Sequence, residues 1–314
     1  MKDASHSIIS LDYHLRVAGA PDHLRHVINE VARASKYIVR EVWQGSAGFA
    51  GSQNQFGEDQ LQVDILSNMI IEKQLTESAL VHSYASEEKP ELVMLHENGH
   101  YTVVFDPLDG SSLVDTDFAI GTIVGVYPKG DVVGRSPREQ IAALYIIYGP
   151  KTVLIYSLGG GNGVHQFVLN SIGEFVLDRE YLGVGDDAKV YAPGNIAAAS
   201  ENGAYKMLLD QWIARKMTLR YSGGMVPDIH HIFAKGNGIF VNLGGGKFPQ
   251  GKLRLLYECG PFAFLMEEAG GASSDGAASL LDQKITSLDQ RTQIIIGSKH
   301  EVENAVKSLN GERS

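Results

Sequence analysis

Apolar residues recur at three- and four-residue spacing in several stretches of the chain, and this period predicts amphipathic helices. The longest stretch opens after Pro21, covers residues 24–42 and is expected to end near Gly45. A second helix is predicted over residues 65–75. Three further helices are expected towards the C-terminus, at residues 204–215, 261–269 and 300–309.

Short apolar runs bounded by turn residues predict strands between these helices. The expected strands cover residues 80–84, 101–105, 119–127, 141–148, 153–157, 196–199, 238–241 and 293–296. The run Gly159 to Gly163 (GGGNG) lies between two apolar stretches and predicts a hairpin turn, because no helical pattern follows it. Helices alternate with strands, and several strands are joined by short turns. We therefore expect an α/β (α+β) fold with mixed sheets.

Two segments interrupt this pattern. The composition shifts at residues 181–193, which predicts a boundary between two lobes, residues 1–190 and residues 191–314. Residues 45–59 (GSAGFAGSQNQFGED) show no periodicity and contain four glycines, so we expect a mobile loop there. An inert linker and a catalytic lid are both compatible with such a loop.

The chain has 314 residues, and its 27 Lys and Arg against 37 Asp and Glu give a formal charge of −10. The apolar share of 44% excludes a wholly disordered chain. The acidic balance argues against nucleic acid as a partner. No run of 18 apolar residues occurs, and the first ten residues lack the apolar stretch of a secretory signal. We therefore expect a cytoplasmic protein without a membrane partner.

Two acidic clusters follow two of the predicted strands. Glu87 and Glu88 come after the first, and Asp106 and Asp109 come after the second. Ligands meet open α/β sheets at the carboxyl ends of strands, so these side chains are candidates for one site. Four carboxylates gathered there would repel one another unless cations lay between them, and oxygen ligands select Mg²⁺, Mn²⁺ or Ca²⁺. A solvated acidic face and an ordinary capped turn are the simpler alternatives.

The residues around the second cluster could serve both a cation and a phosphate. Pro107 fixes the chain, and the Leu108 carbonyl can turn towards a cation. Gly110 lets the backbone approach an anion closely, and Ser111 and Ser112 can open a helix whose free N–H groups face a phosphate. This pairing predicts metal-assisted hydrolysis of a phosphate ester.

The same run (FDPLDGSS, residues 105–112) resembles the signature of the sugar bisphosphatases, a group within the inositol-phosphatase-like metal-dependent phosphatases. Four further segments resemble motifs of that family in the family's order, at residues 60–65, 86–88, 220–227 and 251–259. The resemblance covers about residues 24–298. It implies a layered α-β-α-β-α fold with two lobes, a metal-binding N-terminal one and a substrate-binding C-terminal one, and hydrolysis with Mg²⁺, Mn²⁺ being the other possible ion.

Within the family, three segments look more like the sedoheptulose-1,7-bisphosphatase branch than the fructose-1,6-bisphosphatase branch, at residues 86–92, 114–117 and 218–228. The fructose branch often carries Tyr where this chain has Asn242, which is compatible with a longer sugar. The expected reaction is release of the 1-phosphate of sedoheptulose 1,7-bisphosphate. A fructose or dual-specificity bisphosphatase, an inositol monophosphatase-like enzyme and a sugar-phosphate-binding scaffold are the alternatives. The resemblance to the sedoheptulose branch also implies an alternative location: the protein could be the mature form of a plastid enzyme instead of a cytoplasmic protein.

The resemblance implies a role for each matching residue. Asp64, Glu88 and Asp109 would be catalytic, and Asp64 would help to activate the attacking water, with Glu58 or Asp59 assisting. The implied metal ligands are Glu87, Glu88, Asp106, the Leu108 carbonyl, Asp109 and Glu258. The implied substrate-binding residues are Gly110, Ser111, Ser112, Asn202, Tyr205, Arg220, Tyr221, Met225 and Lys252. Arg220 resembles an arginine donated across a dimer interface, so we expect a homodimer or a higher homo-oligomer.

The remaining candidate residues have simpler explanations. The single cysteine, Cys259, cannot form an intramolecular disulfide and is expected in the core. His230 and His231 are expected to be structural rather than metal ligands. Arg254 is expected either to touch phosphate or to pair with Glu258.

Overall fold

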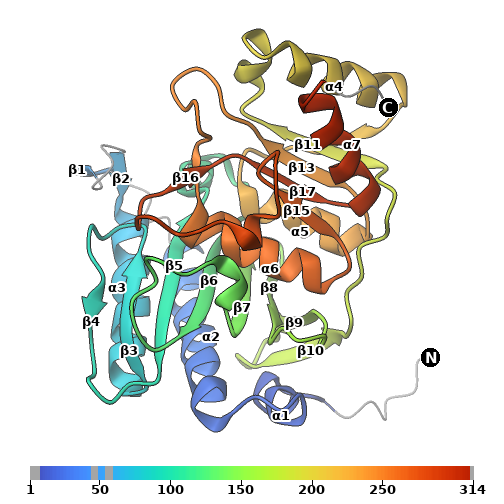
Figure 1. Ribbon diagram of the computed structural model, residues 1–314. Coiled ribbons are helices and arrows are strands. Elements are labelled where there is room, and N and C mark those ends of the chain that lie inside the picture. The colour runs from blue at the N-terminus through green and yellow to red at the C-terminus, as the bar shows by residue number, and fades with distance from the viewer. Residues whose placement is uncertain (1–7, 44–48, 54–58, 312–314) are drawn as a thin grey trace.

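The computed structural model describes residues 8–43, 49–53 and 59–311 and shows five alternating layers of helices and sheets (Figure 1). A helical layer covers one face of a large sheet, and two central helices separate its other face from a smaller sheet. Two more helices cover the outer face of the smaller sheet. The predicted mixed-sheet, layered α-β-α-β-α fold is therefore confirmed.

The first helical layer consists of α1 (Leu11–Val17), α2 (Asp22–Trp43) and α3 (Gln62–Ser78). The apolar positions of α2 that recur at helical spacing are buried against the sheet, as the periodicity predicts. The expected structureless loop before α3 is wrong in part, because β1 (Phe49–Gln53) and β2 (Asp59–Leu61) pair there as antiparallel strands. Glu58 lies outside the described residues.

The large sheet has eight strands in the order β10-β9-β8-β7-β6-β5-β3-β4. Neighbouring strands are antiparallel except for β3 and β5, which run parallel. The turn predicted at Gly159 to Gly163 does join two antiparallel strands, β8 and β9. The strands are β3 (Val81–Ser86), β4 (Val93–Met94), β5 (Tyr101–Asp109), β6 (Ile120–Pro128), β7 (Ala142–Tyr148), β8 (Thr152–Ser157), β9 (His165–Leu169) and β10 (Phe175–Arg179).

The smaller sheet has five strands in the order β12-β11-β13-β17-β15 and is also mixed. The strand expected at residues 196–199 is wrong: Ile196–Ser200 is a 3-10 helix, and the strand β11 ends two residues earlier. The three consecutive alanines at residues 197–199 offer no β-branched side chain, the kind that favours a strand. The strands are β11 (Val190–Gly194), β12 (Thr218–Leu219), β13 (Ile239–Asn242), β15 (Ala272–Ser274) and β17 (Ile294–Gly297).

The central helices α5 (Met225–Lys235) and α6 (Gly260–Glu268) bury apolar side chains against both sheets. Cys259 lies in this core and is fully buried, as expected of a core residue. A short pair, β14 (Leu253–Arg254) and β16 (Arg291–Thr292), leads into a π-helical turn, Leu255–Cys259, just before α6. The segment before α6 is therefore a strand followed by a helical turn.

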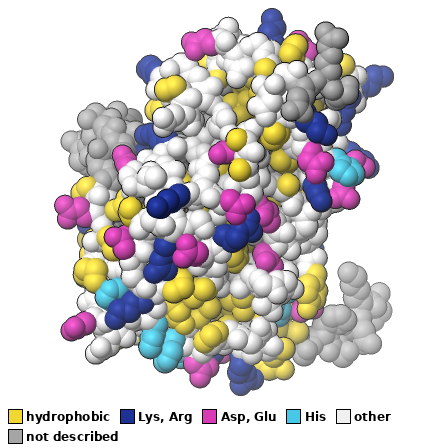
Figure 2. All heavy atoms as spheres, in the orientation of Figure 1, with side chains coloured by type: hydrophobic (Ala, Val, Ile, Leu, Met, Phe, Trp, Pro, Cys, Tyr) yellow, Lys and Arg dark blue, Asp and Glu magenta, His cyan; other side chains and the backbone are white. Residues whose placement is uncertain are grey.

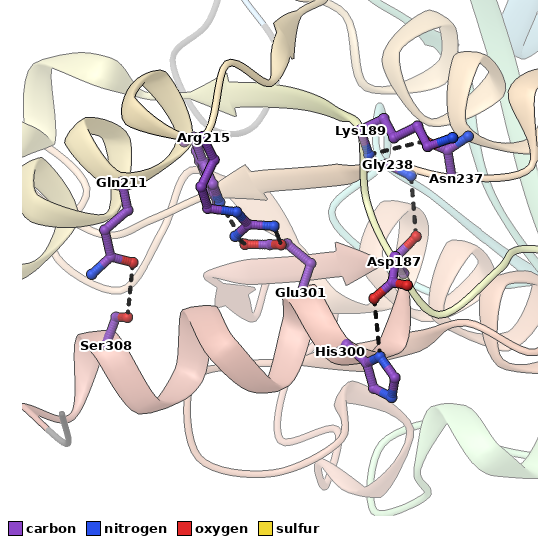
Figure 3. A network of polar contacts seen from close by, with 11 residues as sticks. Asp187, Lys189, Gln211, Arg215, Asn237, Gly238, His300, Glu301 and Ser308 are labelled. Carbon is purple, nitrogen blue, oxygen red and sulfur yellow. Dashed lines mark hydrogen bonds and ion pairs between the residues drawn. The ribbon is translucent and has the colours of Figure 1, made fainter. Parts of the chain in front are cut away.

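The outer helices α4 (Gly203–Ala214) and α7 (Lys299–Leu309) are joined by a buried carboxylate (Figure 3). Glu301 accepts hydrogen bonds from both terminal nitrogens of Arg215, at 2.9 and 2.7 Å, and from the Trp212 indole at 2.7 Å. These contacts satisfy a charge that would otherwise be buried without a partner. They also tie the two helices together over the outer face of the sheet.

The surface carries charges of both signs. Figure 2 shows Lys and Arg interspersed with Asp and Glu over one face of the molecule. Among the described residues, no helix combines the length and apolar character that a membrane crossing requires.

Candidate active site

A pocket of about 640 Å³ opens where the parallel strands β3 and β5 end. The Glu87 amide donates to the Phe105 carbonyl at 3.1 Å, which holds the end of β3 beside β5. The Ser86 hydroxyl donates to the Asn68 side chain at 2.7 Å and fixes α3, the helix that carries Asp64, against the same strand end. Both predicted acidic clusters and Asp64 line this pocket.

An irregularity in β5 turns two carboxylates to the same side. Three residues apart on a regular strand, Asp106 and Asp109 would point to opposite faces of the sheet. They pair instead with Ile123 and Gly121, so β5 carries one extra residue at this point. Pro107 sits in the irregular segment, where a residue without an amide donor is tolerated. Both carboxylates therefore line the pocket, and the strand runs through the motif instead of ending before it.

Asp109 is held by the first turn of α5. Its Oδ2 accepts a hydrogen bond from the Val226 amide at 2.7 Å. This contact requires Gly121 on β6, because a Cβ at that position would lie 2.4 Å from the Val226 side chain. The glycine thus lets α5 approach the sheet closely enough to position the catalytic candidate.

Glu258 reaches the same cluster from the π-helical turn before α6. Its Oε2 accepts from the Arg254 amide at 2.6 Å. The Arg254 guanidinium forms an ion pair with Glu87, and the expected pairing of Arg254 with Glu258 is present through its backbone amide. The Arg254 guanidinium is thus one positive charge that the chain itself places among the carboxylates.

Three carboxylates of this cluster are almost fully buried, and their oxygens lie within 4.8 Å of one another. They belong to Asp106, Asp109 and Glu258. Burial, together with repulsion from the neighbouring carboxylates, raises the pKa of each well above its ordinary value. Without a cation these groups would hold protons at pH values where ordinary carboxyl groups have lost them.

The donor set fits a hard divalent cation. All the groups that converge are carboxylate oxygens, and a cation between them would remove the repulsion that raises their pKa values. Sulfur donors are absent from the residues that line the pocket apart from the thioether of Met225. Mg²⁺ or Mn²⁺ therefore suits the site better than zinc does.

The residues after Asp109 form a turn beside the carboxylates. Gly110 has a φ of 79°, the left-handed region that glycine adopts most easily, and precedes a 3-10 helix at Ser111–Thr116. The predicted helix start at Ser111 is thus present, although as a 3-10 helix. Its first amides lie at the pocket wall, together with the side chains of Ser111 and Ser112.

The structure brings most of the predicted site residues into one pocket. Those that line it are Asp64, Glu87, Glu88, Asp106, Leu108, Asp109, Gly110, Ser111, Ser112, Tyr221, Met225, Lys252 and Glu258. Their individual roles stay predictions.

Three predicted substrate-binding residues do not line this pocket. Asn202 caps α4 by accepting from the Tyr205 amide at 3.0 Å. Tyr205 is fully buried, and its hydroxyl donates to the Gly194 carbonyl at 2.8 Å. Arg220 is exposed and donates to the neighbouring Leu219 carbonyl.

Sequence reasoning missed several residues that line the pocket. Lys247, Phe248 and Asn195 line it, as do Asn242 and Lys252. Lys247 follows three consecutive glycines, and a lysine after a glycine run is the signal that could have drawn attention to it. His230 lies elsewhere: its Nδ1 contacts the Tyr145 hydroxyl at 3.0 Å, and burial lowers its pKa to about 4, which fits the expected structural role.

Comparisons with known proteins agree with this architecture. The family model described as "Fructose-1-6-bisphosphatase, N-terminal domain" matches residues 7–180, and the corresponding C-terminal domain matches residues 184–310. A class 1 fructose-1,6-bisphosphatase of Syntrophotalea carbinolica is 44% identical over 97% of this chain and 95% of its own length. A chloroplastic sedoheptulose-1,7-bisphosphatase of Triticum aestivum is 39% identical over 96% of this chain and 77% of its own length. The fructose-1,6-bisphosphatase structure from Leishmania major superposes with a TM-score of 0.91 at 28% identity, covering 98% of this chain and 100% of that one.

The chain belongs to the fructose-1,6-bisphosphatase family. Its members are metal-dependent phosphoric monoester hydrolases that act on sugar bisphosphates. The expected membership of the sugar bisphosphatases is thus confirmed. The expected preference for the sedoheptulose branch is not supported at that finer level, because relatives named as fructose-1,6-bisphosphatases reach higher identity than the wheat enzyme.

Proposed function

We propose that this protein hydrolyses the 1-phosphate of fructose 1,6-bisphosphate, using Mg²⁺ held by the buried carboxylates. The observation that carries the proposal is the convergence of Asp106, Asp109 and Glu258 beside the turn at Gly110. Relatives named as fructose-1,6-bisphosphatases, 42–44% identical over almost the whole chain, support this substrate over the sedoheptulose sugar.

The residues that line the pocket include candidate partners for both phosphates of such a substrate. The backbone amides after Gly110 and the hydroxyls of Ser111 and Ser112 would bind the phosphate that is cleaved. Lys252 and Lys247 line the same pocket and would neutralise the second phosphate. An inositol monophosphate would have no use for these two lysines. The pair therefore favours a bisphosphate.

When bound, the divalent cation would stabilise negative charge on the phosphoryl oxygens and lower the pKa of a bound water. Asp64, at the first turn of α3, would take the proton that the attacking water loses. The Val226 amide keeps Asp109 in position, and Asp109 would be one of the carboxylates that hold the cation. Glu88 and the Leu108 carbonyl complete the proposed ligand set.

Sedoheptulose 1,7-bisphosphate is the second candidate, and one residue favours it. Asn242 lines the pocket. A short side chain there leaves more room for an additional hydroxyl of a seven-carbon sugar.

The test is phosphate release, with Mg²⁺, from fructose 1,6-bisphosphate, sedoheptulose 1,7-bisphosphate, fructose 1-phosphate and inositol 1-phosphate. We expect the highest kcat/KM for fructose 1,6-bisphosphate and at least about tenfold lower values for both monophosphates, because they lack the second charged end. A higher kcat/KM for the sedoheptulose sugar would reverse the order of the two candidates. Equal rates for inositol 1-phosphate would overturn the bisphosphatase proposal.

A further inference from the structure

A second cluster of potential metal ligands lies away from the pocket described above. His14 on α1, His165 at the start of β9 and Glu180, just after β10, each offer a donor atom, and the three atoms lie within 4.8 Å of one another. Three strands, β6, β7 and β8, separate β9 from β5, the strand that carries the carboxylate cluster. Neither the proposed reaction nor its substrate uses these residues.

The His165 side chain is prepared for a ligand. It is 2% exposed, and its Nε2 contacts the Asn162 carbonyl at 2.8 Å, so Nε2 carries the proton. Its Nδ1 is buried and has no hydrogen-bond partner among the described residues. A histidine that donates from one nitrogen to a carbonyl and keeps the other free has the arrangement of a metal ligand.

His14 differs from His165 in that both of its ring nitrogens have partners. Its Nδ1 contacts the Tyr156 hydroxyl at 2.5 Å, and its Nε2 contacts Glu180 Oε1 at 3.1 Å. Tyr156 pairs directly with His165 across β8 and β9, so the tyrosine supports the site from the sheet. With a metal at Nε2, the Nδ1 proton would point to the Tyr156 oxygen, and Glu180 would become a ligand instead of a hydrogen-bond acceptor.

We propose that His14, His165 and Glu180 form a second metal site that binds Zn²⁺ and has a structural role. Two imidazole nitrogens and one carboxylate suit zinc, whereas Mg²⁺ prefers oxygen donors alone. Donor atoms around one tetrahedral zinc lie about 3.3 Å apart, so side-chain shifts of about 1 Å would close the cluster. The Glu180 side chain is 47% exposed, which leaves a path for the ion and room for water as the fourth ligand.

The ion would fasten the N-terminal segment to the edge of the large sheet. That segment already lies along β10, where the Leu177 amide donates to the Ile9 carbonyl at 2.9 Å and Ser10 pairs with Val176 (Figure 1). The zinc would add a bond from α1 to β9 and to the residue that follows β10. Binding energy at such a site stabilises the folded state, because an unfolded chain does not present the three ligands together.

The test starts from the chelator-treated protein, adds millimolar Mg²⁺ to compete for the carboxylate pocket, and then titrates with Zn²⁺ and with Co²⁺. We expect one zinc per chain to bind at this cluster, and Co²⁺ to give the intense visible bands of a tetrahedral site with nitrogen ligands. At a zinc concentration about 100 times the Kd, the Tm should rise by about 4 °C.

Variants assign the signal to the cluster. His165→Gln should abolish the cobalt bands and the zinc-dependent rise in Tm, and Glu180→Gln, at a half-exposed side chain, should weaken binding. Tyr156→Phe should weaken it about 10- to 100-fold, as loss of a supporting hydrogen bond does. His300→Gln, at an exposed histidine that contacts Asp187, is the matched control and should behave as wild type.

Unchanged zinc binding and cobalt bands in both His165→Gln and Glu180→Gln would overturn the proposal, and so would a wild-type chain that binds no zinc. The carboxylate pocket is intact in every variant, so these outcomes do not bear on the proposed hydrolysis.

Discussion

Asp109 combines three features that rarely occur together in a structural residue. It is buried, it lies among other carboxylates, and a backbone amide on α5 fixes one of its oxygens.

Loss of its charge in Asp109→Asn should lower kcat about 10³-fold, equivalent to about 4 kcal/mol of transition-state stabilisation. Phosphate release from fructose 1,6-bisphosphate measures this. Asp115→Asn, at an exposed carboxylate of the adjacent 3-10 helix, is the control and should retain full activity. Substantial turnover by Asp109→Asn would remove Asp109 from the mechanism.

The same buried carboxylates make stability depend on pH and on metal. Burial and mutual repulsion raise the pKa of Asp109 to about 7 and that of Glu258 to about 8. The folded state therefore holds protons that the unfolded chain has already lost, and stability falls as pH rises from about 4 to about 8. His230, with its lowered pKa, acts in the opposite direction, but only below pH about 6.5.

We accordingly expect the Tm of the chelator-treated protein to fall by several degrees between pH about 6.5 and pH about 8.5. Added Mg²⁺ should raise the Tm more at the higher pH, because ionised carboxylates bind the cation and protonated ones do not. Scanning calorimetry with and without Mg²⁺ measures both effects. A Tm that rises with pH in the chelated protein would contradict this account of the cluster.

At the scale of elements, the site depends on how closely α5 approaches β6. In Gly121→Ala the new Cβ would lie 2.4 Å from the Val226 side chain and 2.5 Å from the Ile146 carbonyl oxygen. We expect α5 to move away and the protein to lose about 1–3 kcal/mol of stability, measured by urea unfolding. The displaced Val226 amide should also reduce kcat. Gly203→Ala, at a helical position with open space around it, is the control and should not destabilise the protein. A Gly121→Ala protein as stable and active as wild type would show that α5 does not position Asp109.

The elements also show which parts of the fold a single sequence can reveal. The long periodic helix α2 and the apolar strands β5 to β8 follow directly from their patterns. Helix α5 was not predicted, because Pro227 and the two glycines before Met225 resemble a loop, although proline is well tolerated in a first helical turn. The irregularity in β5 could not be predicted from the sequence either. Asp106 and Asp109 are three residues apart on a strand, and only the pairing with β6 shows that both face the pocket.

For the molecule as a whole, the predicted oligomer bears on Arg220, because Arg220 does not line the pocket that contains most of the other predicted site residues. Arg220 is exposed and outside its own chain's pocket, which fits the predicted contribution to a neighbouring subunit. If so, Arg220→Ala and Asp109→Asn chains should complement each other. Random pairing of the two chains in a symmetric dimer should restore about a quarter of the wild-type sites, since each mixed dimer has one intact site. Co-expression followed by activity assay measures this. A mixture no more active than its two components would show that Arg220 does not act across an interface.

The molecule and its proposed substrate are both negatively charged, so they would repel each other unless the pocket carried positive charge. The chain carries −10, yet Lys252, Lys247 and Arg254 line one pocket, and the carboxylates there are arranged to hold divalent cations. Cations in the cluster would therefore make the pocket attractive to a bisphosphate within an acidic protein.

The most direct test of this account is the Mg²⁺ dependence of phosphate release from fructose 1,6-bisphosphate by the purified protein. We predict no measurable hydrolysis after chelation, full recovery on addition of Mg²⁺, and no recovery in Asp109→Asn. Hydrolysis that persists in the presence of chelator, or a metal-loaded protein that releases no phosphate from any sugar bisphosphate, would contradict the account.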